Sequence, residues 1–310
     1  MFIHRLFFAR RLISAALLLG LLMPLTSRAQ AASGAHTITV TDYNGDKVSL
    51  QQPARRIIAL APHIVENLYS AGAGQYLVGA VDYCDYPPQA KAITRVGSIS
   101  SHSIEAILAQ QPDLVIAWNS GYGGKIIGKL RALGVPVYAS NPLQLEDVAR
   151  SIRDYGKLAN TTAVAEKAAQ TFLTRLQGLR DQYTDHRRLT VLYEVWNSPL
   201  QTLNGEHIIS DVIALCGGQN VFADAAVIAP KISLESVLSR NPDVIVASGM
   251  GEERPEWLDD WRKWPSLKAV QNNHLFFIPP DIIQRHTARI LQGVNEMCVH
   301  LESARTPLSE

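Results

Sequence analysis

An internal repeat restricts the folds that this chain can adopt. The stretch "SIEAILAQQPDLVIA" begins at Ser103, and "SLESVLSRNPDVIVA" begins at Ser233. Identical residues occupy the paired positions Ser103/Ser233, Glu105/Glu235, Leu108/Leu238, Pro112/Pro242, Asp113/Asp243 and Ala117/Ala247. In each copy the serine suits a helix N-cap, the glutamate lies in the first turn, and the proline ends the helix. The repeat therefore predicts a capped helix–turn–strand unit that is used twice.

A second pair of segments follows the same order along the chain. "HIVENLYSAGAGQ" begins at His63, and the similar "HIISDVIALCGGQ" begins at His207. Short strands that are apolar on both faces alternate with helices around these segments, as in a parallel α/β sheet. Residues 144–188 hold only helical spacing, with a possible break near "ANTT". We predict an α/β fold of two similar Rossmann-like lobes, 32–143 and 189–310, joined by a long helix with a ligand cleft between them.

The N-terminus has the features of an export signal. Arg5, Arg10 and Arg11 precede the apolar run 12–25, and "AQA" at 29–31 offers a cleavage site. A charged start, a short apolar core and small residues at the cleavage site are typical of a secretory signal peptide. The run is shorter than the roughly 20 residues that cross a bilayer. We therefore expect residues 1–31 to be removed and the mature protein to be periplasmic.

Composition excludes some classes of function. The chain has 310 residues, of which 18% are charged, and a formal net charge of +1, so no general attraction to nucleic acid is expected. No G-x-S-x-G elbow, P-loop or H-E-x-x-H motif occurs in the sequence. Two exported lobes with a cleft between them indicate instead a binding protein for an importer, without chemistry or cofactor. A periplasmic enzyme is the remote alternative.

Several of these motifs resemble a known family. The stretches "VDYCDYPPQA" (81–90), "SIEAILAQQPDLVIAW" (103–118), "CGGQNVF" (216–222) and "SLESVLSRNPDVIV" (233–246) carry the likeness. They resemble the helical-backbone substrate-binding proteins of ABC importers, and within them the periplasmic vitamin B12-binding branch. The resemblance implies cobalamin or a related corrinoid as ligand. It also implies a monomer that delivers this ligand to a permease dimer with ATPase subunits. Haem or a ferric siderophore is the alternative cargo.

The resemblance also implies roles for individual residues. Glu105 and Glu235 correspond to acids that dock on the permease, although helix capping alone also explains them. Of the three cysteines, Cys216 and Cys298 correspond to a disulfide, which leaves Cys84 free. The candidates for contact with the ligand are Tyr86, Trp118, Phe222, Asp281 and Arg285. Around Ile99, Ala229 and 282–283 the chain has small or aliphatic residues where the branch would suggest aromatic ones.

Other residues have more than one interpretation. Trp196 follows a strand end, and we expect it to face the cleft. Trp257, Trp261 and Trp264 have helical spacing, which suits either packing onto the second lobe or an aromatic wall at the cleft rim. His63 and His207, with His102 or His286, are weak candidates for a direct metal site, and we expect none. His286, Tyr86 or Cys84 could instead supply one ligand to the metal centre of the cargo, or His286 could hydrogen-bond the ligand.

Overall fold

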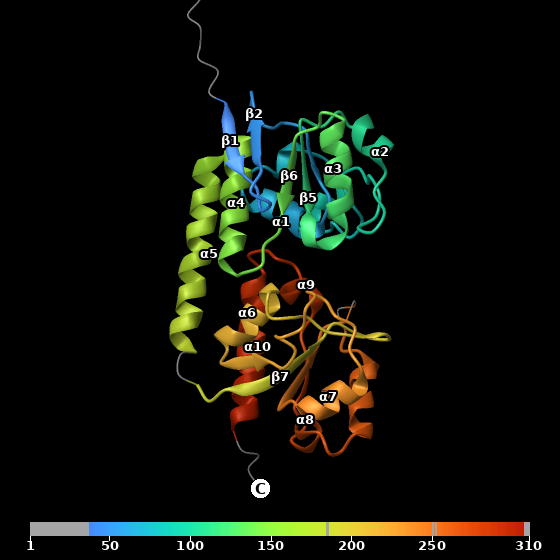
Figure 1. The fold of residues 1–310 in the computed structure, drawn as a ribbon. Coiled ribbons are helices and arrows are strands. Elements are labelled where there is room, and N and C mark those ends of the chain that lie inside the picture. Colours follow the sequence, from blue (N-terminus) through green and yellow to red (C-terminus); the bar gives the residue numbers. More distant parts are fainter. Residues whose placement is uncertain (1–36, 184–185, 250, 252, 307–310) are drawn as a thin grey trace, which may run out of the picture. The chain divides into compact units, whose positions relative to one another are not determined.

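Two four-stranded sheets, each wholly parallel, form the framework of this protein (Figure 1). The structure is a computed structural model that describes residues 37–183, 186–249, 251 and 253–306. The predicted signal peptide, 1–31, lies outside the described residues. The described residues belong to one compact unit. None of the helices in the described ranges has the length and apolar character needed to cross a membrane.

The first lobe has the sheet order β4-β3-β5-β6. Its strands are β3 (Ile57–Ala59), β4 (Leu77–Ala80), β5 (Leu114–Trp118) and β6 (Val137–Ser140). Its helices are α1 (Pro62–Ser70), α2 (Ile104–Ala109) and α3 (Gly124–Ala132). A hairpin of β1 (Ile38–Thr41) and β2 (Lys47–Leu50) precedes them. Its turn holds Gly45 at φ +84°, a left-handed conformation that favours glycine, as the Asn44-Gly45 pair predicts.

The second lobe repeats this plan with the sheet order β10-β7-β11-β12. Its strands are β7 (Leu189–Glu194), β10 (Gly218–Asn220), β11 (Val244–Ala247) and β12 (Leu275–Phe277), and a small hairpin pairs β8 (Trp196–Asn197) with β9 (Leu200–Gln201). Its helices are α6 (Ile208–Leu215), α7 (Leu234–Arg240), α8 (Lys268–Gln271), α9 (Pro280–Ile283) and α10 (Ile290–Arg305). In both lobes the first strand is central and the second lies at an edge, so the predicted α/β fold of two lobes is confirmed.

The repeated stretches occupy equivalent places in the two lobes. Ser103 caps α2 by accepting a hydrogen bond from the backbone N–H of Ala106 at 3.1 Å, and Ser233 caps α7 by accepting from Ser236 at 3.2 Å. In the next strand of each copy, residues 114–117 of β5 and all four residues of β11 are buried. The predicted helix–turn–strand unit is therefore present twice.

Two helices, α4 (Glu146–Ala159) and α5 (Thr162–Gln182), connect the sheets. They pack against each other, and the break near "ANTT" is real because Asn160 adopts a left-handed conformation between them. Gly156 allows this close packing, since a Cβ there would lie 2.2 Å from the Cβ of Ala165. The 21-residue α5 contacts α1 of the first lobe and α10 of the second, so it is the predicted joining helix.

A disulfide between Cys216 and Cys298 is present, as the resemblance predicts. It ties the end of α6 to α10, and both cysteines are completely buried. Cys84 is free and is also buried. Burial raises the pKa of the Cys84 thiol to about 12, so the thiol stays protonated and is a poor ligand for a metal centre.

Candidate functional site

The candidate ligand residues lie on segments that follow the carboxyl ends of strands in both lobes. His63 follows β3, Tyr86 follows β4, and Trp118 ends β5. In the second lobe Trp196 follows β7, and the segment from Asp281 to His286 follows β12. The carboxyl ends of parallel strands meet at one edge of a sheet, which is where ligands of open α/β sheets bind. The structure brings several of these segments into contact, and we call this region the interlobe junction.

A network of charged side chains crosses the junction. Glu66 of α1 is buried, and its carboxylate accepts hydrogen bonds from Arg285 at 3.0 Å and from Arg289 at 2.7 Å. The Arg285 guanidinium also contacts Asp85 at 2.9 Å and Asp281 at 2.8 Å. Burial alone would lower the pKa of Arg285, but hydrogen bonds to Asp85 and Glu66 raise it. Both arginines therefore stay charged, and they pair with acids from both lobes.

Neither Glu66 nor Arg289 was predicted from the sequence. Glu66 is the one acid of α1, and the buried part of this helix also holds the polar residues His63 and Asn67. No spacing in the sequence distinguishes Glu66 as a junction residue. Arg289 also covers the ring of Tyr86, with its guanidinium carbon 4.0 Å from the ring centre, which is a cation–π contact. Tyr86 remains 44% exposed at the edge of this network.

Three histidines meet beside the ionic network. The ring of His286 lies 5.2 Å from that of His63 and 5.3 Å from that of His207, measured between ring centres. Trp118 makes edge contacts with His63 at 5.2 Å and with His286 at 5.6 Å. The structure thus brings His63 and His207, which occupy equivalent positions in the repeat, into contact with His286. His102 lies elsewhere, in the segment that precedes α2.

Burial keeps these imidazoles neutral. It lowers the pKa of His63 to about 3, with a further contribution from the positive charge of Arg285. It lowers the pKa of His207 to about 4 and that of His286 well below its ordinary value. The three rings do not form a metal cage, because no group of three His, Cys, Asp or Glu in the described part of the chain is arranged to hold a metal ion.

Several polar atoms in this cluster lack a hydrogen-bond partner. They are Nε2 of His63, Oδ1 of Asn67, Nε1 of Trp118, and both ring nitrogens of His286. Asn67 is otherwise engaged, since its Nδ2 donates to the backbone carbonyl of His286 at 2.9 Å. His207 differs from the other two histidines because its Nδ1 caps α6 by accepting from the N–H of Ile209 at 3.2 Å. The junction therefore offers polar groups that a bound molecule could satisfy.

The remaining predicted aromatic residues separate into two groups. Trp196 is half-buried and pairs with Trp257, with ring centres 6.5 Å apart. Trp261 instead packs in the core of the second lobe, where its Nε1 donates to Glu194 at 2.7 Å. Trp264 is 36% exposed, so the three tryptophans do not form one wall.

Phe222 does not lie where a lining residue would. Its side chain is 3% exposed and belongs to the hydrophobic core of the second lobe. The guanidinium of Arg240, from the end of α7, covers the ring at 4.5 Å. Phe222 therefore packs the lobe and presents no surface to a ligand in this structure.

Glu105 and Glu235 project from the first turns of α2 and α7, and both are exposed. Among the described residues, neither carboxylate forms an ion pair. The other repeated acid behaves differently. Asp113 accepts hydrogen bonds from the N–H groups of Arg55 and Arg56 at 2.7 and 3.0 Å, and Asp243 accepts from Thr190 at 2.8 Å. The repeated aspartates thus hold neighbouring strands, whereas the repeated glutamates lie exposed at the surface.

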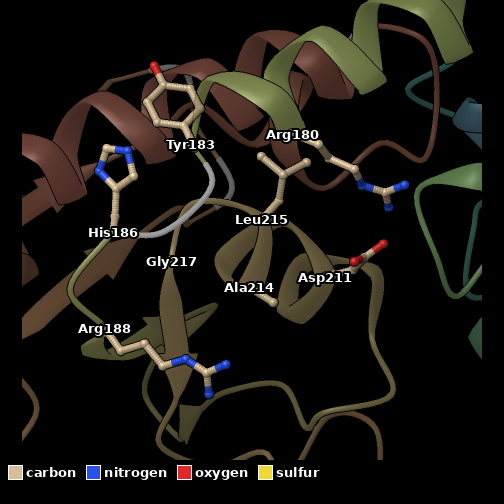
Figure 2. A pocket seen from close by; sticks show the side chains of 8 residues that line it. All are labelled: Arg180, Tyr183, His186, Arg188, Asp211, Ala214, Leu215 and Gly217. Atoms are coloured by element: carbon tan, nitrogen blue, oxygen red, sulfur yellow. The ribbon is translucent and has the colours of Figure 1, made fainter.

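A separate pocket of about 460 Å³ lies between the C-terminal end of α5, helix α6 and the residues that precede β7 (Figure 2). It is lined by Arg180, Tyr183, His186, Arg188, Asp211, Ala214, Leu215 and Gly217. Its lining includes none of the histidines of the junction cluster and none of the residues of the ionic network.

Comparison with known proteins places this architecture in a family. The periplasmic binding protein family matches residues 57–282. The vitamin B12-binding protein of Vibrio cholerae is 39% identical over 254 residues, which cover 82% of this chain and 91% of the relative. That of Yersinia pestis is 33% identical over 259 residues, which cover 84% of this chain and 90% of the relative.

Solved structures give the same assignment. The periplasmic vitamin B12 binding protein BtuF of Vibrio cholerae matches with a TM-score of 0.76 and 39% identity, over 82% of this chain and 99% of that one. The periplasmic heme-binding protein RhuT of Roseiflexus shares the fold, with a TM-score of 0.71 and 24% identity over 82% and 100% of the two chains. This chain belongs to the periplasmic binding protein family.

Proposed function

We propose that this protein captures cobalamin or a related corrinoid at the interlobe junction and delivers it to an ABC importer. The observation that carries the proposal is the match to the vitamin B12-binding protein of Vibrio cholerae, which extends over 99% of that chain. Members of this family are binding proteins, so we expect the ligand to be returned unchanged, without catalysis.

The side chains at the junction suit a corrinoid. A corrin ring is flat and apolar, and amide groups surround its edge. Trp118 from the first lobe and Trp196 from the second offer aromatic surface for the ring. Tyr86, with 44% exposure, adds to this surface. Asp281 and Arg285 supply charged hydrogen-bonding groups for the amide edge.

The proposal also includes export of the protein to the periplasm and delivery of its ligand to the permease. The signal peptide at residues 1–31 would direct the protein to the periplasm, where a disulfide such as Cys216–Cys298 persists. The exposed Glu105 and Glu235, one on each lobe, would pair with basic residues on a permease dimer that carries ATPase subunits. We propose that the binding protein itself acts as a monomer.

The test is a titration of the purified exported protein with cyanocobalamin, cobinamide, haem and a ferric siderophore. Calorimetry should give a corrinoid Kd of about 1 μM or tighter. Trp118→Ala should weaken binding, whereas the core variant Phe222→Leu should leave affinity unchanged once the fold is verified by circular dichroism. Mass spectrometry of the released ligand should recover it intact. Failure of all corrinoids to bind would overturn the proposal.

A specific observation favours haem as the second candidate. His286 is a neutral, buried imidazole whose ring nitrogens lack partners, and such a group can serve as an axial ligand to haem iron. Binding of haem but not of corrinoids in the same titration would select this alternative.

A further inference from the structure

In the histidine cluster at the interlobe junction, packing does not explain why the ring of His286 has no hydrogen-bond partner. His286 is 2% exposed, and both of its ring nitrogens lack hydrogen-bond partners. An unsatisfied buried polar atom typically costs about 1–3 kcal/mol in desolvation. A histidine retained in a core for packing would be expected to use at least one nitrogen, as His207 does when it caps α6.

The position of His286 indicates how a bound ligand would reach these unpartnered nitrogens. The rings of His63 and Trp118, which contact that of His286, belong to the first lobe, whereas His286 and His207 belong to the second. Parting the lobes would therefore uncover His286 on the side that faces the first lobe. A molecule held between the lobes would meet this ring, with the candidate residue Trp118 opposite.

We propose that His286 is an axial ligand, through one ring nitrogen, to the cobalt of a corrinoid whose axial position is held by water. This inference rests on the proposed function. The step breaks the cobalt–oxygen bond to water and forms a cobalt–nitrogen bond, and the water leaves. The oxidation state of cobalt does not change.

The local environment suits this role. Metal coordination needs the neutral imidazole, and burial keeps His286 neutral, since the low dielectric and the neighbouring His63 and His207 disfavour its charged form. Asn67 fixes the backbone of His286 through the 2.9 Å hydrogen bond to its carbonyl group. Arg285, the preceding residue, is held by Glu66, Asp85 and Asp281. The ring is therefore supported from both lobes while its nitrogens stay available.

The test uses cob(II)inamide, which carries water and no nitrogenous base on its lower face. In its electron paramagnetic resonance spectrum, a coordinated histidine nitrogen splits the cobalt lines into triplets. Bound to the wild-type protein, cob(II)inamide should show this splitting, and ¹⁵N-histidine labelling should convert triplets to doublets. His286→Ala should abolish the splitting, while His274→Ala, which changes a half-buried histidine of the same lobe, should preserve it.

Affinity provides a second measurement. His286→Ala should weaken binding of aquacyanocobinamide by about tenfold or more. Circular dichroism should show that His286→Ala keeps the fold, and the control His274→Ala should bind aquacyanocobinamide as the wild type does. Corrinoid binding without nitrogen splitting would overturn the inference and leave the proposed function standing. Splitting that is lost in His63→Ala but kept in His286→Ala would also overturn it, whereas absence of all corrinoid binding would refute the proposed function itself.

Discussion

The lobe tips and the interlobe junction of this protein differ in how they use the internal repeat. At the tips, α2 and α7 have the same serine cap, the same exposed glutamate and an aspartate with the same structural task. At the junction the lobes are unequal. The first contributes Glu66 and Asp85, while the second contributes both Arg285 and Arg289. Symmetry suits a two-fold partner, and asymmetry suits a single asymmetric ligand.

The largest expected effect is at the tips, and it concerns transport. Glu105→Lys combined with Glu235→Lys should abolish corrinoid uptake into cells, because like charges would replace attraction at both proposed contacts. Calorimetric affinity for the ligand should not change, because both residues are exposed and lie outside the junction. The matched control reverses Glu166, an exposed acid of α5. Normal uptake by the double variant would show that Glu105 and Glu235 are not docking contacts.

At the junction the largest expected effect is on stability. Glu66→Gln leaves Arg285 and Arg289 in a buried network that has lost its central acid, and should cost about 3 kcal/mol or more in free energy of unfolding. Glu166→Gln breaks the exposed pair with Arg153 and should cost less than about 1 kcal/mol. Urea unfolding measures both. If both variants lose the same free energy of unfolding, the buried junction network contributes no more to stability than an exposed ion pair.

The repeated aspartates provide a direct test of equivalence between the lobes. Asp113→Ala and Asp243→Ala each remove a carboxylate that accepts backbone N–H groups of a neighbouring strand. Each should lower the free energy of unfolding by about 1.5–3 kcal/mol, since hydrogen bonds to charged groups have this value. The control Glu235→Ala should cost less, because its carboxylate is exposed. Markedly different losses of unfolding free energy in the two aspartate variants would show that Asp113 and Asp243 do not have equivalent roles in their lobes.

The smallest expected effect is a pH dependence at the junction. The pKa of His63 is about 3 in the folded protein and 6.5 as its ordinary value, so the unfolded chain binds more protons between these limits. Stability should therefore fall as the pH decreases from 6.5, and this ring should account for about 1–2 kcal/mol between pH 7 and 5. His63→Gln should reduce the slope of unfolding free energy against pH by this amount.

Another buried group titrates in the opposite sense. Burial raises the pKa of Glu194 from 4.5 to about 7, so the folded protein binds more protons there and gains stability as the pH falls through this range. Because Glu194 is present in both proteins, its contribution cancels in the comparison of wild type with His63→Gln. An unchanged slope in the variant would show that His63 does not titrate as a buried group.

Patterns that are local in the sequence predicted the elements well. Capping serines, proline stops and the alternation of apolar strands with helices act over a few residues, and they identified both lobes. The family resemblance identified the pairing of Cys216 with Cys298. The equivalence of His63 and His207 was also visible in the repeat, although nothing local indicated that His286 lies beside both.

Neither the resemblance nor the helical spacing determined the surroundings of residues that long-range packing positions. Phe222, a candidate for ligand contact by resemblance, has its ring in the core of the second lobe beneath Arg240. The spacing of the tryptophans allowed two arrangements, and Trp261 adopts the first, since it packs in the core of the second lobe and donates to Glu194. Helical spacing specifies a face of a helix, but it does not say what that face contacts.

Short-range propensity and the internal repeat were enough to predict the α/β class, the two lobes and the equivalence of their tips. The packed fold was needed to show that Glu66 neutralises two arginines from the other lobe and that three histidines share one buried cluster. Glu66 and Arg289 are far apart along the chain, and their pairing exists only once the two sheets face each other. Burial, which sets the charge of these groups, is likewise a property of the assembled lobes.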